Sequence, residues 1–211
     1  MSTKKCVVLF SGNGSNLENL LNESDSIKDK LNYVSAFTNN IKAKGIEVCK
    51  RFNLEVCIGK KDTLNEELNE FLSNNNPDLI VLSGYMKIIP EFIVSKYLGK
   101  IINIHPSLLP KYPGLNTYEK VIKNKDRQHG ATVHFVTKDL DKGPIILQGV
   151  FDVKQGITKI KLEAYTHETE YIIFPIVIGW FAENIIELRE NQVYLEARLI
   201  SEPIIHKVNE G

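Results

Sequence analysis

The sequence predicts an α/β protein with a doubly wound, mostly parallel sheet, antiparallel strands at one edge and a long C-terminal helix. Short apolar, β-branched runs alternate with segments of helical length through the first half of the chain. This alternation is typical of parallel strands joined by crossover helices. After Gly130, two strand-like runs follow each other across a loop rich in turn formers, and a long apolar segment comes next. The expected arrangement is Rossmann-like.

The parallel part of the sheet is expected to use five short strands. They are Cys6 to Phe10, Tyr33 to Phe37, Glu55 to Ile58, Leu79 to Leu82 and Ile101 to Ile104. A helix is expected to begin around Leu17, directly after the first strand and its glycine turn. The carboxyl ends of such strands collect ligands, so polar residues there are the first candidates for a site.

The second half predicts two antiparallel edge strands, Thr132 to Thr137 and Ile145 to Val153, followed by a helix from Thr158 to Glu190. We expect that helix to be kinked or interrupted near Pro175, because proline lacks the N–H that the helical ladder needs. Its most apolar part, Tyr171 to Ala182, is too short to span a bilayer and is predicted to be buried.

Composition indicates one globular domain with no nucleic-acid or membrane partner. The chain has 211 residues, and its 26 basic side chains are balanced by 26 acidic ones, so the basic surface typical of nucleic-acid binding is absent from the composition. The three cysteines, Cys6, Cys49 and Cys57, lack metal-type spacing and fit a reducing compartment, which predicts a cytoplasmic protein. The apolar run at the amino terminus is too short for a signal peptide.

A first candidate site is the glycine turn Ser11-Gly12-Asn13-Gly14-Ser15-Asn16. Glycines allow close backbone approach, and the free N–H groups at a helix start attract phosphate. The dinucleotide fingerprint is incomplete because Leu17 replaces its third glycine, and no Gly-Lys-Ser/Thr follows for a nucleoside-triphosphate loop. A phosphate monoester fits better, although a plain turn capped by Ser15 or Asn16 remains an alternative.

A second candidate is the pair Asn103 and His105 at the end of the fifth strand. Residues two apart in a strand share a face, so an amide and an imidazole should project together while Ile102 and Ile104 face the other layer. An amide donor beside a titratable ring suits oxyanion stabilisation and proton transfer. The alternative is a buried pair in which His105 only bonds a backbone carbonyl.

Asp141 is the third candidate, because a carboxylate beside His105 would orient the ring and stabilise its charged form. Its loop, Asp139 to Pro144, is equally compatible with an ordinary solvated turn. Other chemistries fit less well. The five histidines lack a His-x-x-x-His or Cys-x-x-Cys partner, so no metal is expected. Ser107 stands next to a proline rather than in Gly-x-Ser-x-Gly, so a serine nucleophile is not expected.

Five motifs in order closely resemble the phosphoribosylglycinamide formyltransferases of de novo purine biosynthesis. They are Ser11 to Asn16, Gly84-Tyr-Met-Lys-Ile-Ile89, Asn103-Ile-His-Pro-Ser-Leu-Leu-Pro110, His129-Gly-Ala-Thr-Val-His-Phe-Val136 and Asp139-Leu-Asp-Lys-Gly-Pro144. The resemblance runs from the first strand to about Ala182. It implies that the formyl group of 10-formyltetrahydrofolate, a co-substrate, passes to the amine of glycinamide ribonucleotide by direct attack through a tetrahedral intermediate.

The resemblance also implies roles for individual residues. Asn103, His105 and Asp141 match the family's catalytic residues. The ribonucleotide would be held by Gly14, Ser15, Asn16 and Glu170. The folate would be held by Lys61, Met86, Lys87, Ile88, Ile89, Asn103, Thr137, Lys138, Asp139, Leu140 and Asp141. One formyltransferase domain would span residues 1–211, with a phosphoribosyl-binding half at about 1–100, a catalytic and folate-binding half at about 101–211, and a monomer or homodimer as the assembly.

This chain departs from the family pattern at two places. Asn116 and Tyr118 stand where many members have histidines, and Lys61 stands where an arginine contacts the folate's glutamate tail. Lysine keeps the charge but loses the bidentate fork. A phosphoribosyl-binding module without chemistry is therefore kept as an alternative, and formyltetrahydrofolate hydrolases and methionyl-tRNA formyltransferases share the Asn-x-His-Pro-Ser core. Composition and length favour the ribonucleotide enzyme over these relatives.

Overall fold

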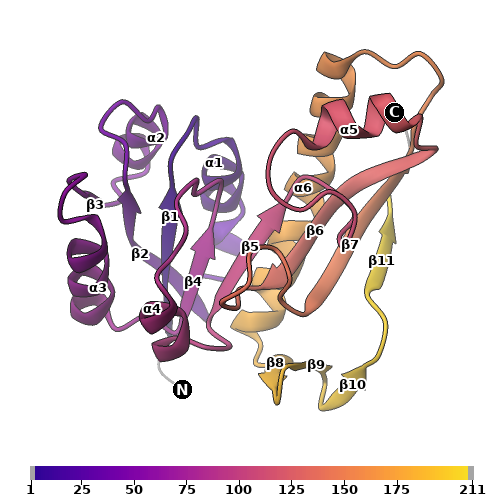
Figure 1. The fold of residues 1–211 in the computed structure, drawn as a ribbon. Coiled ribbons are helices and arrows are strands. Elements are labelled where there is room, and N and C mark those ends of the chain that lie inside the picture. The colour runs from indigo at the N-terminus through magenta and orange to yellow at the C-terminus, as the bar shows by residue number, and fades with distance from the viewer. Residues whose placement is uncertain (1–2, 209–211) are drawn as a thin grey trace.

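A single eight-stranded sheet forms the centre of the computed structural model, which describes residues 3–208 (Figure 1). Its strands lie in the order β11-β7-β6-β5-β4-β1-β2-β3. Their bounds are β1 Lys4–Phe10, β2 Leu31–Thr38, β3 Val56–Ile58, β4 Leu79–Leu82, β5 Ile101–His105, β6 Gln128–Phe135, β7 Ile145–Asp152 and β11 Ile204–Lys207. The helices are α1 Ser15–Asn22, α2 Gly45–Arg51, α3 Leu64–Asn75, α4 Glu91–Lys96, α5 Thr117–Asn124 and α6 Lys159–Ala182, with a 3-10 turn at Ser24–Ser26.

The sheet confirms the predicted mixture of strand directions. Strands β3, β2, β1, β4 and β5 pair in parallel, whereas β6 pairs antiparallel with both β5 and β7. The predicted strands are all present, and their ends shift by a few residues. The largest shift is in β6, which begins four residues before the expected Thr132. The observed strand order places the carboxyl ends of β1, β4 and β5 side by side.

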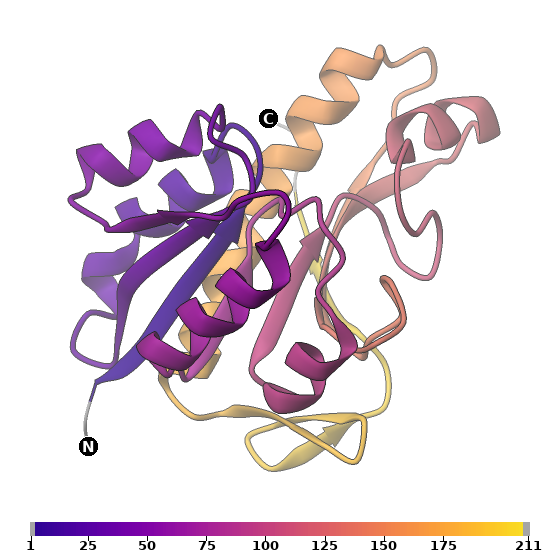
Figure 2. The ribbon, with the colours of Figure 1, turned by 60° about the vertical axis from the view of Figure 1, so that its left-hand side comes forward.

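Two helical layers cover the sheet, as expected for a doubly wound fold. Val8, Val81 and Ile102 belong to a core shared with helices α1, α2 and α6. Val7, Ile80 and Ile101 belong to the opposite core, which α3 and α4 cover. Figure 2 shows α3 in front of the sheet and α6 behind it. Strands buried on both faces explain why their sequences are continuous apolar runs rather than alternating ones.

The predicted helix from Thr158 to Glu190 is wrong at its carboxyl end. Helix α6 stops at Ala182, and Asn184 takes a left-handed conformation (φ 60°), which is a common way to end a helix. The Lys4 ammonium group donates to the last-turn carbonyls of Phe181 and Ala182, at 2.7 and 2.8 Å, and so satisfies groups that a continuing helix would have used.

The chain beyond α6 forms strands that the sequence analysis did not predict. Strands β8 Ile186–Arg189, β9 Gln192–Leu195 and β10 Arg198–Ile200 make a small antiparallel sheet, and β11 then adds to the edge of β7. Pro175 lies inside one continuous helix, so the predicted interruption does not occur. Within residues 3–208, no helix is both long enough and apolar enough to cross a membrane.

Candidate functional site

Strand β5 places Asn103 and His105 on the same face of the sheet, as predicted. Ile102 and Ile104 lie in the core on the α6 side, so the two polar residues face the opposite side. His105 is buried and Asn103 is half-buried. Because the site lies where a parallel strand ends and the chain direction changes, it occupies the position where ligands bind in doubly wound folds.

His105 and Asp141 come together, although 36 positions separate them in the chain. The Nδ1 atom of His105 lies 3.4 Å from Oδ2 of Asp141, and both side chains are more than 90% buried. The Nε2 atom of His105 lies 2.9 Å from the carbonyl oxygen of Tyr112. Both ring nitrogens therefore face oxygen acceptors. The alternative of a carbonyl-bonded histidine describes only half of this arrangement, because the carboxylate is present as well.

Asn103 is held by His134, a residue that the sequence analysis did not single out. The register of β5 and β6 places these two residues opposite each other, and Asn103 Nδ2 lies 3.1 Å from His134 Nε2. His134 Nδ1 lies 2.8 Å from the carbonyl of Phe135. Burial lowers the pKa of His134, so the ring is neutral; Nδ1 donates to Phe135 and Nε2 accepts from Asn103.

This geometry leaves Asn103 with one amide hydrogen committed to His134 and the other available for a ligand. His134 Nε2 also lies 3.7 Å from Oδ1 of Asp141. The contact between Asn103 and His134 could not be predicted from the sequence alone, because it depends on which residue of β6 lies opposite Asn103. The strand-like run that contains His134 was predicted, but its register was not.

The predicted folate-binding segments lie around the same edge. Met86 to Ile89 follow β4, the neighbour of β5, and Thr137 to Leu140 lead into Asp141 between β6 and β7. Three apolar side chains in these segments are exposed: Met86, Ile88 and Leu140, at 64%, 75% and 58%. Lys87, Lys138 and Asp139 are exposed, Thr137 is half-buried and Ile89 is buried. Lys61 is exposed after β3, three strands beyond β4 in the sheet order.

The glycine turn and Glu170 form a second polar cluster. Gly14 precedes α1 with φ 78°, and within residues 3–208 neither Ser15 nor Asn16 caps the helix with a side-chain hydrogen bond. Asn16 Nδ2 donates to Glu170 Oε2 at 2.8 Å, joining residues that lie 154 positions apart. Glu170 is 3% exposed, and the Oδ1 atom of Asn16 is buried without a hydrogen-bond partner among residues 3–208.

His167 completes this second cluster and was not predicted from the sequence. Its Nδ1 atom lies 2.8 Å from Glu170 Oε2, the oxygen that Asn16 also contacts. That hydrogen bond raises the pKa of His167, and its burial opposes the rise. The i, i+3 spacing of His167 and Glu170 on α6 was the available sequence signal, because such residues are neighbours on a helix surface. It indicates a site only together with the contact between Asn16 and Glu170. Both contacts of Glu170, with His167 and with Asn16, involve Oε2.

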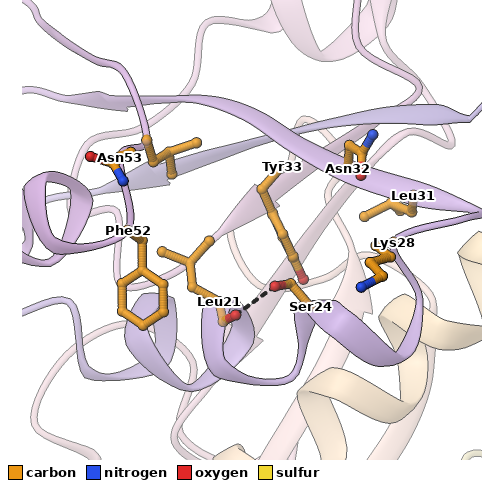
Figure 3. Close-up of a pocket in the computed structure, with 9 residues that line it drawn as sticks. Leu21, Ser24, Lys28, Leu31, Asn32, Tyr33, Phe52 and Asn53 are labelled. Carbon is orange, nitrogen blue, oxygen red and sulfur yellow. Dashed lines mark hydrogen bonds between the residues drawn. The ribbon is translucent and has the colours of Figure 1, made fainter.

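A pocket of about 180 Å³ lies away from both clusters (Figure 3). It is lined by Leu21, Ser24, Lys28, Leu31, Asn32, Tyr33, Phe52, Asn53 and Leu54. These residues belong to the last turn of α1, the amino end of β2 and the segments after α1 and α2, and none is a predicted site residue. Among residues 3–208, no group of three or more His, Cys, Asp or Glu side chains is arranged to hold a metal ion.

Comparison with known proteins agrees with the geometry. Residues 4–178 match the family model described as formyl transferase. The phosphoribosylglycinamide formyltransferase of Escherichia coli K12 is 37% identical, covering 91% of this chain and 93% of that protein. The Haemophilus influenzae enzyme of the same name is 36% identical over 93% of this chain and 96% of that protein.

Solved structures agree as well. The phosphoribosylglycinamide formyltransferase of Coxiella burnetii superposes with a TM-score of 0.90 at 33% identity, covering 97% of this chain and 99% of that one. The fold, the matched residues and these relatives together show that the chain belongs to the formyl transferase family.

Proposed function

We propose that this protein is a phosphoribosylglycinamide formyltransferase, which transfers the formyl group of 10-formyltetrahydrofolate to the amine of glycinamide ribonucleotide in purine biosynthesis. The observation that carries the proposal is the gathering of Asn103, His105 and Asp141 at the end of β5, with the Asn16 and Glu170 cluster as a separate ligand-binding point. Relatives bearing this enzyme name, at 36–37% identity over most of the chain, support it.

In this proposal the ribonucleotide binds between α1 and α6. The backbone N–H groups of Gly14, Ser15 and Asn16 bind its phosphate, because the start of a helix attracts anions. Glu170 Oε1 and Asn16 Oδ1 accept hydrogen bonds from the ligand's hydroxyl or amine groups. The unpartnered, buried Oδ1 atom of Asn16 supports this assignment, since buried acceptors without donors are costly.

The residues after β4 and β6 suit the folate. Exposed Met86, Ile88 and Leu140 offer apolar contact to a flat ring, and the backbone of Met86 to Ile89 and of Thr137 to Asp141 offers polar groups beside it. Lys61 would meet the negatively charged tail. The folate, when bound, supplies the formyl carbon that the amine attacks.

The chemistry is assigned to three side chains. The free amide N–H of Asn103 donates a hydrogen bond to the formyl oxygen as negative charge develops on that oxygen. His105 carries a proton at Nδ1, the nitrogen that is not bonded to Tyr112, and Asp141 stabilises the charged ring. Because both substrates are held at one strand edge, proximity supplies a large part of the rate.

The arrangement along the chain follows from these assignments. Residues 1–100 form the phosphoribosyl-binding half, and residues 101–211 form the catalytic and folate-binding half, with Glu170 reaching back from the second half to Asn16 of the first. We propose that the enzyme works in the cytoplasm as a monomer or homodimer.

The test is formyl transfer by purified protein, with folate and ribonucleotide together and each alone, following deformylated folate and formylated product. We expect product only with both substrates. His105→Ala and Asp141→Asn should each lose activity by orders of magnitude while the circular dichroism spectrum is retained, whereas His206→Ala, on the distant β11, serves as the control.

Two other results would contradict the proposal. Folate deformylation without the acceptor indicates a hydrolase. Ligand binding at Gly14 to Asn16 without any turnover indicates a phosphoribosyl-binding module. Near-normal activity in His105→Ala would instead overturn the assignment of the catalytic residues.

A further inference from the structure

A short backbone segment, Tyr112 to Gly114, contacts both members of the buried pair. The carbonyl of Tyr112 lies 2.9 Å from His105 Nε2, and the N–H of Gly114 donates to Asp141 Oδ2 at 2.8 Å. The same Asp141 oxygen faces His105 Nδ1 at 3.4 Å. Any movement of this segment therefore changes the position of the ring and of the carboxylate together.

The side chain of Tyr112 ties the segment to the end of α5. Its hydroxyl donates to Asp126 Oδ2 at 2.8 Å and accepts from Asn124 Nδ2 at 2.7 Å. The ring packs against the apolar cluster of Val121, Phe151 and Leu162. Asp126 is largely buried, with a side-chain exposure of 15%, and Lys111 lies 3.5 Å from its other oxygen. The anchor therefore combines a charged acceptor, an amide donor and apolar contact.

The backbone of Tyr112 needs such an anchor. Its φ of 56° lies in the left-handed region, which costs a residue with a side chain about 1 kcal/mol or more and persists where surrounding contacts maintain it. This conformation turns the carbonyl toward His105 Nε2. The hydrogen bond from the Tyr112 hydroxyl to Asp126, 14 positions later in the chain, thus holds the peptide group that faces His105.

We infer that Tyr112 is a positioning residue for the transfer reaction: its hydroxyl, bound to Asp126, holds the backbone carbonyl that fixes the ring of His105. The inference rests on the proposed function. A carbonyl oxygen can only accept a hydrogen bond, so the contact with Tyr112 requires a hydrogen on Nε2 of His105. Nδ1 of His105, beside Asp141, is then the nitrogen that exchanges a proton. Tyr112 does not touch the substrates in this assignment, so it affects turnover rather than binding.

The experiment compares kcat and both KM values in four variants. Tyr112→Phe removes only the hydroxyl, and Asp126→Ala removes its acceptor; each should lower kcat about tenfold and leave both KM values within about twofold. Asp126→Asn keeps an oxygen that accepts from the phenol and should retain most of the turnover. Tyr165→Phe is the matched control, because Tyr165 packs against the same cluster without a hydroxyl hydrogen bond among the described residues.

A double variant and a spectroscopic measurement complete the test. Tyr112→Phe combined with Asp126→Ala should lose no more turnover than Asp126→Ala alone, because Asp126→Ala already lacks the contact with the Tyr112 hydroxyl as well as the one with Lys111. The ring resonances of His105, assigned by their loss in His105→Ala, should move in Tyr112→Phe and stay in place in Tyr165→Phe.

Three results would overturn the inference: unchanged kcat in Tyr112→Phe, a rise in KM without a fall in kcat, or additive losses in the double variant. If Tyr112→Phe does not fold, the Asp126→Ala and Asp126→Asn pair decides by the same criteria. If the wild-type protein transfers no formyl group, the proposed function fails, and the resonances of His105 still decide whether Tyr112 positions the ring.

Discussion

His105 and His134 each donate a hydrogen bond from one ring nitrogen to a backbone carbonyl. This contact determines whether the other ring nitrogen faces Asp141 or accepts from Asn103. Tyr112 accepts from Nε2 of His105, leaving Nδ1 beside Asp141. Phe135 accepts from Nδ1 of His134, leaving Nε2 to accept from Asn103. The two rings thus present different nitrogens to the site. Asn103 was predicted as an oxyanion donor, but its orientation depends on a histidine that the sequence analysis passed over.

His129 gives the clearest prediction of pH dependence. It is 1% exposed, lies edge-on to Tyr118 and Phe151, and its Nε2 atom has no hydrogen-bond partner in the described part of the chain. Burial lowers its pKa to about 4, with Asp126 opposing the change and His105 adding to it. The unfolded chain, with a histidine pKa near 6.5, binds the proton first as pH falls. This residue therefore destabilises the fold progressively between about pH 6.5 and pH 4.

The measurement is urea unfolding of wild type and His129→Phe at several pH values from 7.5 to 4. We expect the stability of the wild type to fall by up to about 3 kcal/mol more than that of the variant across this window. Phenylalanine keeps the aromatic contacts and removes the unpartnered nitrogen. Parallel stability curves for the two proteins would show that His129 is not the group responsible.

At the scale of elements, the turn from β6 to β7 carries Asp141 and depends on Gly143. A methyl group on Gly143 would lie 1.7 Å from the carbonyl oxygen of Phe135, so the loop must move to accept it. Asp141 itself has a left-handed φ of 52°, which leaves this short loop little freedom to adjust. A displaced carboxylate no longer faces His105.

Gly143→Ala should therefore lower kcat by tenfold or more and cost about 1–3 kcal/mol of stability, the range for an added methylene in a packed site. Formyl transfer and urea unfolding measure the two effects. Gly179→Ala is the control, because nothing lies within 4 Å of the added methyl group in α6. If Gly143→Ala kept full turnover, the position of this loop would not matter for the reaction.

Helix α6 shows why element ends were harder to predict than element types. The apolar run from Tyr171 to Ala182 is helical, as expected, but it is buried only in part, through Ile173, Phe174, Val177, Ile178 and Ala182. Its end depends on Lys4, which is distant in sequence and binds the last carbonyls. The short strands beyond it carry half-exposed residues and weak periodicity, so β8 was included in the predicted helix and β9 and β10, beyond Glu190, were not predicted.

At the scale of the whole molecule, the C-terminal segment closes the edge of the sheet. Strand β11 pairs in parallel with β7, and β7 itself lies two strands away from β5 in the sheet order. Figure 1 shows it along the outer side of β7, opposite the end of the sheet that holds β3. An open strand edge is a template for pairing with another chain, and β11 replaces the edge of β7 with a strand of four residues, a short edge of the kind that limits such pairing.

Deletion of residues 203–211 should lower the melting temperature by about 4–8 °C, as loss of about 2 kcal/mol does in a domain of this size. It should also increase self-association through the exposed edge of β7, while kcat stays within about twofold. Calorimetry, light scattering and the transfer assay measure these three quantities. Ile205→Thr is the control, since Ile205 is half-exposed and the strand remains. A large loss of turnover would show that the edge supports the site after all.

The sequence by itself determined the doubly wound class, the strands of the main sheet except β11 to within a few residues, and the candidates Asn103, His105, Asp141 and the glycine turn. Those features depend on local patterns: apolar runs, turn residues and the two-residue period of a strand. The tertiary structure decided the contacts of His134 with Asn103, of Asn16 with Glu170 and of Tyr112 with His105. Strand register, helix ends and loop conformation set these contacts. Each of these features depends on groups far apart in the chain, and local propensity does not determine which distant groups come together.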